Sequence, residues 1–303
     1  MTGKTQTGTP SKAAARQSTL TREVVEMRIA RVLKWFFIAL FVLMTAFPFY
    51  WMLNLSVRPI GDVLVNPTRL FPTGEQLANF WDAYSAVLVD FRFLTYIGNS
   101  LLLSLITVFF TLLLAVPGAY AVTRLSFRGK SAMSWGILLV YVFPAIVIAI
   151  PLFVIFSKLG VRGNLPSMII LYLVLTLPVA LYMLRSYFQT IPAELEEAAL
   201  IDGCSRISTI WRIVVPLSVP AIASVALYTF MIAWNEFLFA ILFLTESPNA
   251  WTLPLGLQQL DTQEVPRTYL MAGSVIITVP VIILFFAFER YLRRGLTAGA
   301  VKG

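Results

Sequence analysis

The residues that could do chemistry are few, and four of the 15 acidic residues lie in one polar segment, TIPAELEEAALIDG, between Thr190 and Gly203. A catalytic site would need a base or a nucleophile beside these acids. The chain has no histidine and no GxxxxGK[ST] phosphate loop. Its single cysteine, Cys204, allows neither an internal disulfide nor a cysteine metal cluster. The segment therefore favours binding over catalysis, and we expect no catalytic residue, metal or cofactor in this chain.

A second candidate site is the tripeptide Trp234, Asn235 and Glu236, which interrupts a long apolar run. Glu236 is the one ionisable residue deep in such a run, and acids inside a membrane usually face an interior or a water-filled cavity. These residues are therefore candidates for lining a polar path across the membrane. The alternative is that Glu236 packs structurally against a partner or lies near the outer interface.

The segments that flank the two candidate sites are long and apolar. Hydrophobic residues make up 58% of the chain and charged residues 13%, with a mean hydropathy of +0.81, whereas soluble domains carry roughly a quarter charged residues. A span needs about 20 apolar residues, and in lipid an open segment must be helical. The sequence predicts an all-α membrane protein with six transmembrane helices, over the charge-free runs Trp35–Val57, Phe93–Thr123, Ser131–Ser157, Gly163–Leu184, Ile213–Asn235 and Thr268–Phe288.

The distribution of basic residues predicts the topology. If the N-terminus is cytoplasmic, 17 of the 23 Lys and Arg residues lie inside and six outside, as the positive-inside rule requires. The net charge of +8 therefore reports topology, and we expect no nucleic-acid partner. We expect a cytoplasmic tail and amphipathic flank over residues 1–34, a transmembrane domain over 35–292 with a cytoplasmic loop at 189–216, and a cytoplasmic tail over 293–303.

Within the first of these regions, residues 1 to about 20 are read as a disordered tail. Residues 21–34 are either a short helix at the inner membrane surface or a charged flank that only orients the first span.

The polar segment itself predicts a helix, a turn and a second helix. Early acids suit the helix dipole, and paired alanines allow close approach of a partner. The ends of the helices are marked by Pro192 in the first turn, Gly203 as C-terminal cap and Ser205 as cap of the next helix. Pro216 marks the re-entry into the fifth span. The physics leaves two readings open. The segment is either a docking helix for a soluble protein or an ordinary solvated loop.

The pattern Glu197-Ala-Ala-x-x-Asp202-Gly203, nine residues and then Ile213-x-x-Pro216 resembles the EAA loop of bacterial ABC importer permeases. Val215 departs from the leucine often found before that proline. Three further stretches resemble the carbohydrate, maltose-type branch and its smaller six-span permease: WNEF at 234–237, LPLGL at 253–257 and GLTAGAVKG at 295–303. The resemblance runs from about the first span to the end of the chain.

The resemblance implies a heterodimer with a second permease, two ATPase subunits that bind ATP and Mg²⁺, and an extracytoplasmic sugar-binding protein. It implies a multi-pass protein of a bacterial-type cell membrane that imports a di- or oligosaccharide by alternating access, with a maltose- or trehalose-like α-glucoside as a guess. The implied coupling helix that docks the ATPase comprises Glu194, Glu197, Ala198, Ala199, Asp202 and Gly203, and the implied ATPase-contacting tail residues are Gly299, Val301 and Lys302.

Two other classes of function compete with this interpretation. An ion-driven secondary transporter predicts several buried ionisable residues and often a twofold repeat, whereas this chain offers Glu236 and no visible repeat. A membrane enzyme predicts a cluster of reactive groups near one membrane face, and the acids of the polar segment have no catalytic partner in the sequence.

Overall fold

The computed structural model describes residues 12–298, with side chains for residues 26–291 except 134, 135, 138 and 140–142. No strand occurs among the described residues, which confirms the all-α prediction for this part of the chain. The chain divides into two compact units, Met1–Asn54 and Leu55–Gly303.

The first unit is built on α1 (Lys12–Val57), a 46-residue helix. Residues 12–20 are helical, so the predicted disordered tail is wrong for this stretch. Every side chain from residue 26 to residue 49 is exposed, and the part from Glu26 to Val57 is apolar and long enough to cross a membrane. Exposed apolar side chains in such number are unfavourable in water, so this part of the helix requires lipid or another membrane helix around it.

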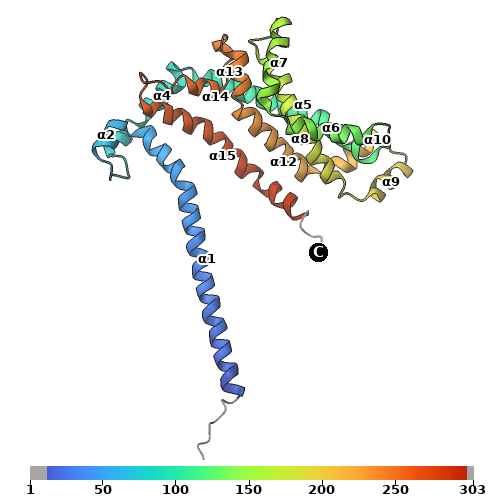
Figure 1. Ribbon diagram of the computed structural model, residues 1–303, viewed down its shortest axis with the longest axis horizontal. Coiled ribbons are helices and arrows are strands. Elements are labelled where there is room, and N and C mark those ends of the chain that lie inside the picture. The colour runs from blue at the N-terminus through green and yellow to red at the C-terminus, as the bar shows by residue number, and fades with distance from the viewer. Residues whose placement is uncertain (1–11, 299–303) are drawn as a thin grey trace, which may run out of the picture. The chain divides into compact units, whose positions relative to one another are not determined.

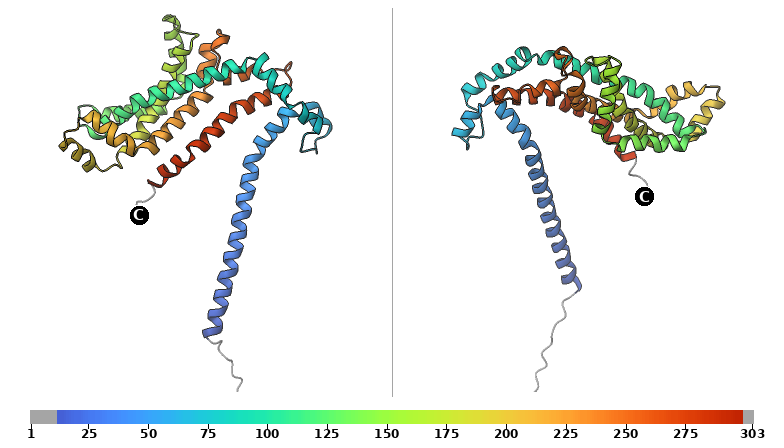
Figure 2. Two further views of the ribbon diagram at one scale, coloured as in Figure 1. Left: turned by 180° about the vertical axis from the view of Figure 1, so that it is seen from behind. Right: turned by 45° about the horizontal axis from the view of Figure 1, so that its top comes forward.

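The second unit is organised by four long helices, α5 (Phe93–Arg124), α8 (Leu165–Phe188), α12 (Val219–Asn235) and α15 (Arg267–Ala298). Helix α5 packs on α8 and α12, and α12 packs on α15, which Figures 1 and 2 show as neighbouring rods. One buried core lies among α5, α8 and the start of α12, and it includes Ala115, Ala119, Ala180 and Leu184. The three alanines let the helix backbones approach closely.

The shorter helices join and cover these rods. They are α2 (Ile60–Val65), α3 (Gly74–Ala78), α4 (Phe80–Ser85), the π-helix η1 (Ala86–Asp90), α6 (Lys130–Val142), α7 (Ala145–Lys158), α9 (Ala193–Ile201), α10 (Arg206–Thr209), the π-helix η2 (Ile210–Val214), α11 (Val215–Leu217), α13 (Leu238–Leu244), the 3₁₀-helix η3 (Pro248–Ala250) and α14 (Leu253–Gln258).

Among the described residues, four helices are long and apolar enough to cross a membrane, or five if a bent pair counts as one span. This establishes a polytopic membrane protein. The predicted third span, Ser131–Ser157, is not one helix, because the chain breaks at Phe143–Pro144 between α6 and α7. Proline disfavours the helical conformation of the preceding residue, so Pro144 divides the run into two helices.

The fifth predicted span also differs from a simple rod. Residues Arg206–Leu217 and Val219–Asn235 meet at an angle of 83°, so the rod of the span begins after Ser218 and Pro216 lies before the bend, in α11. The span then stops at Glu236, and a separate helix, α13, follows.

The two ends of the second unit are therefore different. One end carries α9 and α10, and the other carries α4 and α14 (Figure 1). At the α14 end, Gly256 lies against the ring of Tyr96, where an added Cβ would come within 2.3 Å of a ring carbon. Only glycine permits this approach, which seats α14 on α5.

Candidate functional site

The polar segment forms helix α9 as the sequence predicts, with Pro192 at the N-cap position, one residue earlier than expected. Glu194 and Glu196 lie in its first turn, where the positive end of the helix dipole stabilises negative charge. Because the helix has only nine residues, its ends and its packing must hold it in shape.

The C-terminus of α9 is closed by a Schellman motif. Gly203 has φ +83°, its amide donates to the carbonyl of Leu200 at 3.1 Å, and the amide of Cys204 donates to the carbonyl of Ala199 at 2.9 Å. These two bonds satisfy carbonyls that the helix leaves open. Ser205 then accepts a hydrogen bond from the amide of Ser208 at 3.2 Å and caps α10. Both cap predictions, Gly203 and Ser205, are confirmed.

Helix α9 has two faces of different character. Glu196 and Ala199 are buried, so the alanine pair does not act as a unit: Ala199 faces its own chain and Ala198 is exposed. The predicted docking residues Glu194, Glu197, Asp202 and Gly203 are exposed as well. The outward face of α9 thus carries acidic side chains, and the described part of the chain covers neither this face nor the C-terminal end of the helix.

Large apolar side chains are also exposed on α9 and on the segment that follows it, α10 and η2. Ile201 is 86% exposed and Ile207 is 70% exposed, and the other large members are Leu195, Leu200 and Trp211. We call these five residues together with Glu194, Glu197 and Asp202 the α9 surface. Clustered exposed apolar residues rimmed by charges mark interaction sites. The sequence signal for Leu195 and Ile201 was available, since both are apolar residues in a segment otherwise read as polar.

The inward face of α9 is attached to the long helices by Arg124, which the sequence did not single out. Its Nε donates to Oε1 of Glu196 at 2.8 Å, and one Nη donates to the backbone carbonyls of Phe188 and Ile191 at 3.1 and 2.6 Å. Arg124 ends α5, so one side chain joins three helical elements. The spacing of 72 residues to Glu196 left no local pattern by which to predict this contact.

The second candidate site, Trp234, Asn235 and Glu236, is divided by the structure. Trp234 is 1% exposed and its indole nitrogen donates to the carbonyl of Ile277 on α15 at 3.0 Å. Glu236 accepts from the amides of Phe239 and Ala240 at 2.7 and 3.1 Å and so caps α13. Asn235 is exposed, with its side chain bonded to the carbonyl of Met231. The three residues therefore do not form one surface, and Glu236 has a structural role in the chain.

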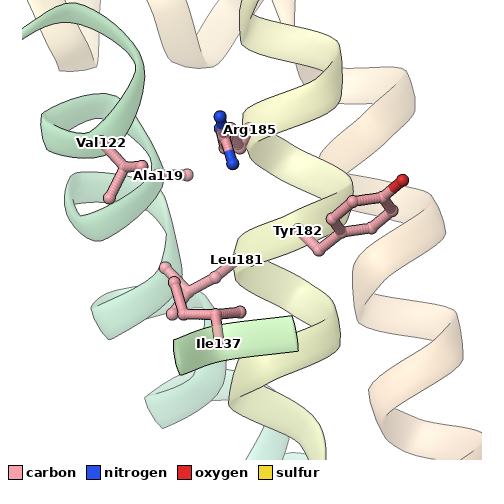
Figure 3. Close-up of a pocket in the computed structure, with 6 residues that line it drawn as sticks. All are labelled: Ala119, Val122, Ile137, Leu181, Tyr182 and Arg185. Carbon is pink, nitrogen blue, oxygen red and sulfur yellow. The ribbon is translucent and has the colours of Figure 1, made fainter. Parts of the chain in front are cut away.

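A small cavity lies between α5, α6 and α8 (Figure 3). Its volume of about 10 Å³ matches one water molecule, so it cannot hold a sugar. The guanidinium of Arg185 points toward Ala119 on α5, and its buried Nε has no hydrogen-bond partner within the described residues.

At the α14 end, the loop after α13 is fixed to α5. Arg92 donates to Oδ1 of Asn249 at 2.8 Å, and Asn99 donates to the carbonyls of Asn249 and Trp251 at 2.9 Å each. A depression of about 790 Å³ opens beside this loop, lined on one side by residues 163–166 and on the other by residues 246–250.

The segment before α5 is braced by a buried arginine. Arg58 is fully buried and donates to the carboxylate of Asp62 and to the backbone carbonyls of Asn66 and Arg69. The hydrogen bonds from Arg58 and then from Gln76 lower the pKa of the Asp62 carboxyl to about 2. This network gives the connection between residues 58 and 76 a fixed conformation.

The predicted tail residues Gly299, Val301 and Lys302 lie outside the described residues. The described residues define a class: a polytopic membrane protein that exposes a capped helix, α9, at one end of its second unit. Residues 107–298 match the family described as "Binding-protein-dependent transport system inner membrane component". The chain therefore belongs to this family and is a permease subunit.

Individual relatives support the assignment. The chain is 39% identical to the inner membrane ABC transporter permease protein YcjP of Escherichia coli, over 88% of this chain and 94% of that protein. It is 37% identical to the trehalose/maltose transport system permease protein MalG of Thermococcus litoralis, over 93% and 99%.

The fold is also that of a solved importer. The structure matches a chain of a bacterial ABC transporter involved in the import of the acidic polysaccharide alginate, with a TM-score of 0.75, 24% identity and coverage of 88% of this chain and 97% of that one.

Proposed function

We propose that this chain is one of two permease subunits of an ATP-driven, binding-protein-dependent sugar importer of a bacterial-type inner membrane. The observation that carries the proposal is the α9 surface, an exposed helix face of acids and large apolar residues, on a chain whose family is that of binding-protein-dependent transport components. Under this proposal α9 is the coupling helix that docks an ATPase subunit, through Glu194, Glu197, Ala198 and Asp202, with Gly203 closing it.

Division of labour follows from the chemistry that the chain lacks. Its sequence has no histidine and no phosphate-binding loop, so ATP and Mg²⁺ are bound by a separate ATPase dimer and hydrolysis takes place there. The permease supplies docking, shape and part of the path. Under this proposal the chain crosses the membrane six times with both termini in the cytoplasm, which puts α9 on the ATPase side and the α14 end outside. The tail residues Gly299, Val301 and Lys302 reach the ATPase in this arrangement.

The α14 end receives the sugar-binding protein. Its depression beside residues 246–250 is open, and the surrounding loop is held by Arg92 and Asn99, which suits a surface that must keep its shape until a partner docks. A related fold has been solved as a bacterial alginate ABC transporter in complex with an alginate pentasaccharide-bound periplasmic protein.

The proposed cargo is a di- or oligosaccharide or another glycoside, such as a maltose- or trehalose-like α-glucoside. Relatives include the trehalose/maltose permease above and a sulfoquinovosyl glycerol permease, SmoH, of Agrobacterium fabrum, at 36% identity over 85% of this chain and 89% of that protein. Because Trp234 is buried and Glu236 caps a helix, Asn235 is the member of the tripeptide whose exposed side chain best suits the path.

Reconstitution tests the proposal. The chain is expressed with its candidate second permease, ATPase and binding protein, and ATP hydrolysis and uptake are measured in proteoliposomes with and without sugar-loaded binding protein. We expect hydrolysis to rise with loaded binding protein. Glu197→Lys, which reverses a charge on the α9 surface, should release the ATPase or abolish that stimulation. Glu26→Lys, an exposed acid on α1, is the matched control.

Two outcomes would contradict the proposal. Uptake that proceeds without any ATPase and follows an ion gradient would identify a secondary transporter. Retention of full stimulation by Glu197→Lys would remove α9 from the docking surface.

A further inference from the structure

We propose that Arg124 and Glu196 form a fixed joint that positions α9 against the membrane-spanning helices, so that movement of the docked helix is transmitted to α5 and α8. The inference rests on the proposed function, since it concerns how a docked ATPase acts on this permease. Arg124 and Glu196 are positioning residues here, and the contacts to the partner are made by the α9 surface.

The first argument is geometric. The Arg124 guanidinium bonds the Glu196 carboxylate on α9, the carbonyl of Phe188 at the end of α8 and the carbonyl of Ile191 in the turn between them. Arg124 itself is the last residue of α5. Planar guanidinium groups hold several acceptors in fixed directions, so this one side chain sets the position of α9 relative to two spans.

Burial supports the same conclusion. The side chains of Arg124 and Glu196 are 18% and 7% exposed, and Tyr120, which is 3% exposed, interacts with the Glu196 carboxylate through its hydroxyl group. A carboxylate taken out of water is costly unless it is paired and hydrogen-bonded. Glu196 therefore cannot leave Arg124 without a penalty, and the pair holds α9 in one place.

A further observation assigns Arg124 to this task alone. An arginine at a helix C-terminus often serves to cap its own helix. Here Lys130 does so, because its Nζ donates to the carbonyls of Thr123 and Leu125 at 3.2 and 3.0 Å. The Arg124 side chain instead extends to the α8–α9 turn.

The surrounding apolar contacts hold the chain on both sides of α9. Ile191 before α9, and Ile210 and Val214 after it, belong to the buried core shared with α5 and α8. Within α9 itself only Glu196 and Ala199 are buried. The two ends of the segment are thus held by packing, and its middle is held by the ion pair.

If the pair is a joint, its loss should separate two properties, binding of the ATPase and movement of the spans. Loss of a docking residue would affect both. Glu196 points away from the exposed face, so its replacement should leave the docking surface intact. Because the ion pair to Arg124 is then lost, α9 should move more freely relative to α5 and α8. The ATPase would stay bound, and its closure would no longer move the spans. Loss of a docking residue would instead release the ATPase.

The first measurement uses the full chain in lipid nanodiscs without an ATPase. Cys204 is the single cysteine of the chain, it directly follows the α9 cap, and it is half-buried, so its modification by a maleimide reports motion of the segment. We expect Glu196→Ala and Arg124→Ala to raise the rate about tenfold, as for local opening of a region that has lost its main restraint. Glu196→Gln, which keeps an acceptor, should raise it less, and Arg124→Lys should restore part of the protection.

Arg128→Gln is the matched control, since it removes an exposed arginine from the same connection and should leave the Cys204 rate unchanged. If the alanine variants give too little folded protein, the comparison of Glu196→Gln with Arg128→Gln decides. Equal Cys204 rates in those two variants and the original chain would overturn the joint.

The second measurement uses the assembled importer. For Glu196→Gln we expect undiminished co-purification of the ATPase and a several-fold fall in sugar transported per ATP hydrolysed. Loss of co-purification with an unchanged Cys204 rate would make Glu196 a docking residue and refute the proposal. If the unsubstituted complex shows no ATP-driven uptake at all, the proposed function fails, while the Cys204 rates still decide whether the joint exists.

Discussion

Replacement of Gly203 tests why position 203 needs glycine. The reason is either the left-handed backbone conformation of the α9 cap or the absence of a side chain. Gly203 has φ +83°, and a Cβ built on it meets no other atom within 4 Å in the chain. An added Cβ at this position therefore meets no steric obstacle from the described part of the chain. Any loss in this chain must come from the left-handed backbone that the Schellman motif requires.

The size of the effect follows from that geometry. A non-glycine residue in the left-handed region costs roughly 1–2 kcal/mol, which changes the ratio of capped to frayed helix by a factor of roughly 5–30. Asparagine and aspartate tolerate this region better than alanine, and β-branched residues tolerate it worst. We therefore expect coupling activity in the order wild type, then Asn and Asp, then Ala, then Val at position 203.

The assay is stimulation of ATP hydrolysis by sugar-loaded binding protein in the reconstituted complex, with amide hydrogen exchange over residues 193–204 as the structural readout. Gly61→Ala is the control, because Gly61 lies in α2, a Cβ there also meets nothing within 4 Å, and its φ is not positive. Equal losses for Asn, Ala and Val without faster exchange would refute the backbone argument and indicate that the bound partner senses any side chain at this position.

Two further predictions concern other parts of the structure. Glu236→Ala should destabilise the chain by about 1–2 kcal/mol, because the amides of Phe239 and Ala240 lose their acceptor; thermal unfolding measures this against Asn235→Ala, and an unfolding temperature equal to that of the control would contradict the capping role. The brace around Asp62 should loosen as pH falls from the ordinary pKa of 3.8 toward about 2, since a carboxyl with a depressed folded-state pKa contributes stability only while it stays ionised. Hydrogen exchange over residues 58–76 follows this loosening, and an equally steep pH dependence in Asp62→Asn would exclude Asp62 as its source.

Local signals in the sequence were sufficient where the structure depends on neighbouring residues. Gly203 and Ser205 were predicted as caps because a cap needs only the few residues around it, and the structure places both there. The long apolar runs likewise predicted α5, α8 and most of α15, since the length needed to cross a membrane is a property of a single segment.

The sequence was insufficient where the structure depends on distant partners. Glu194, Glu196 and Glu197 look equivalent as letters, but only Glu196 is buried, because Arg124 lies opposite it 72 residues earlier in the chain. The paired alanines were read as one surface, yet a helix turns by about 100° between neighbours, so Ala198 and Ala199 face different ways. The run Ser131–Ser157 was read as one span, and the break at Phe143–Pro144 within it shows that the length of an apolar run alone does not reveal an interruption.

The arrangement of restraints along the second unit is consistent with the proposed transport cycle. At the α14 end, Arg92 and Asn99 fix the loop that faces the open depression. At the α9 end, Arg124 fixes the inward face of a helix whose outward face is free to bind. The predicted spans of this unit are interrupted at Pro144, at the 83° bend beside Ser218 and at Glu236. If both ends dock partners as proposed, bending concentrates at these breaks while each docking surface keeps its shape, so that one end responds when the other is moved.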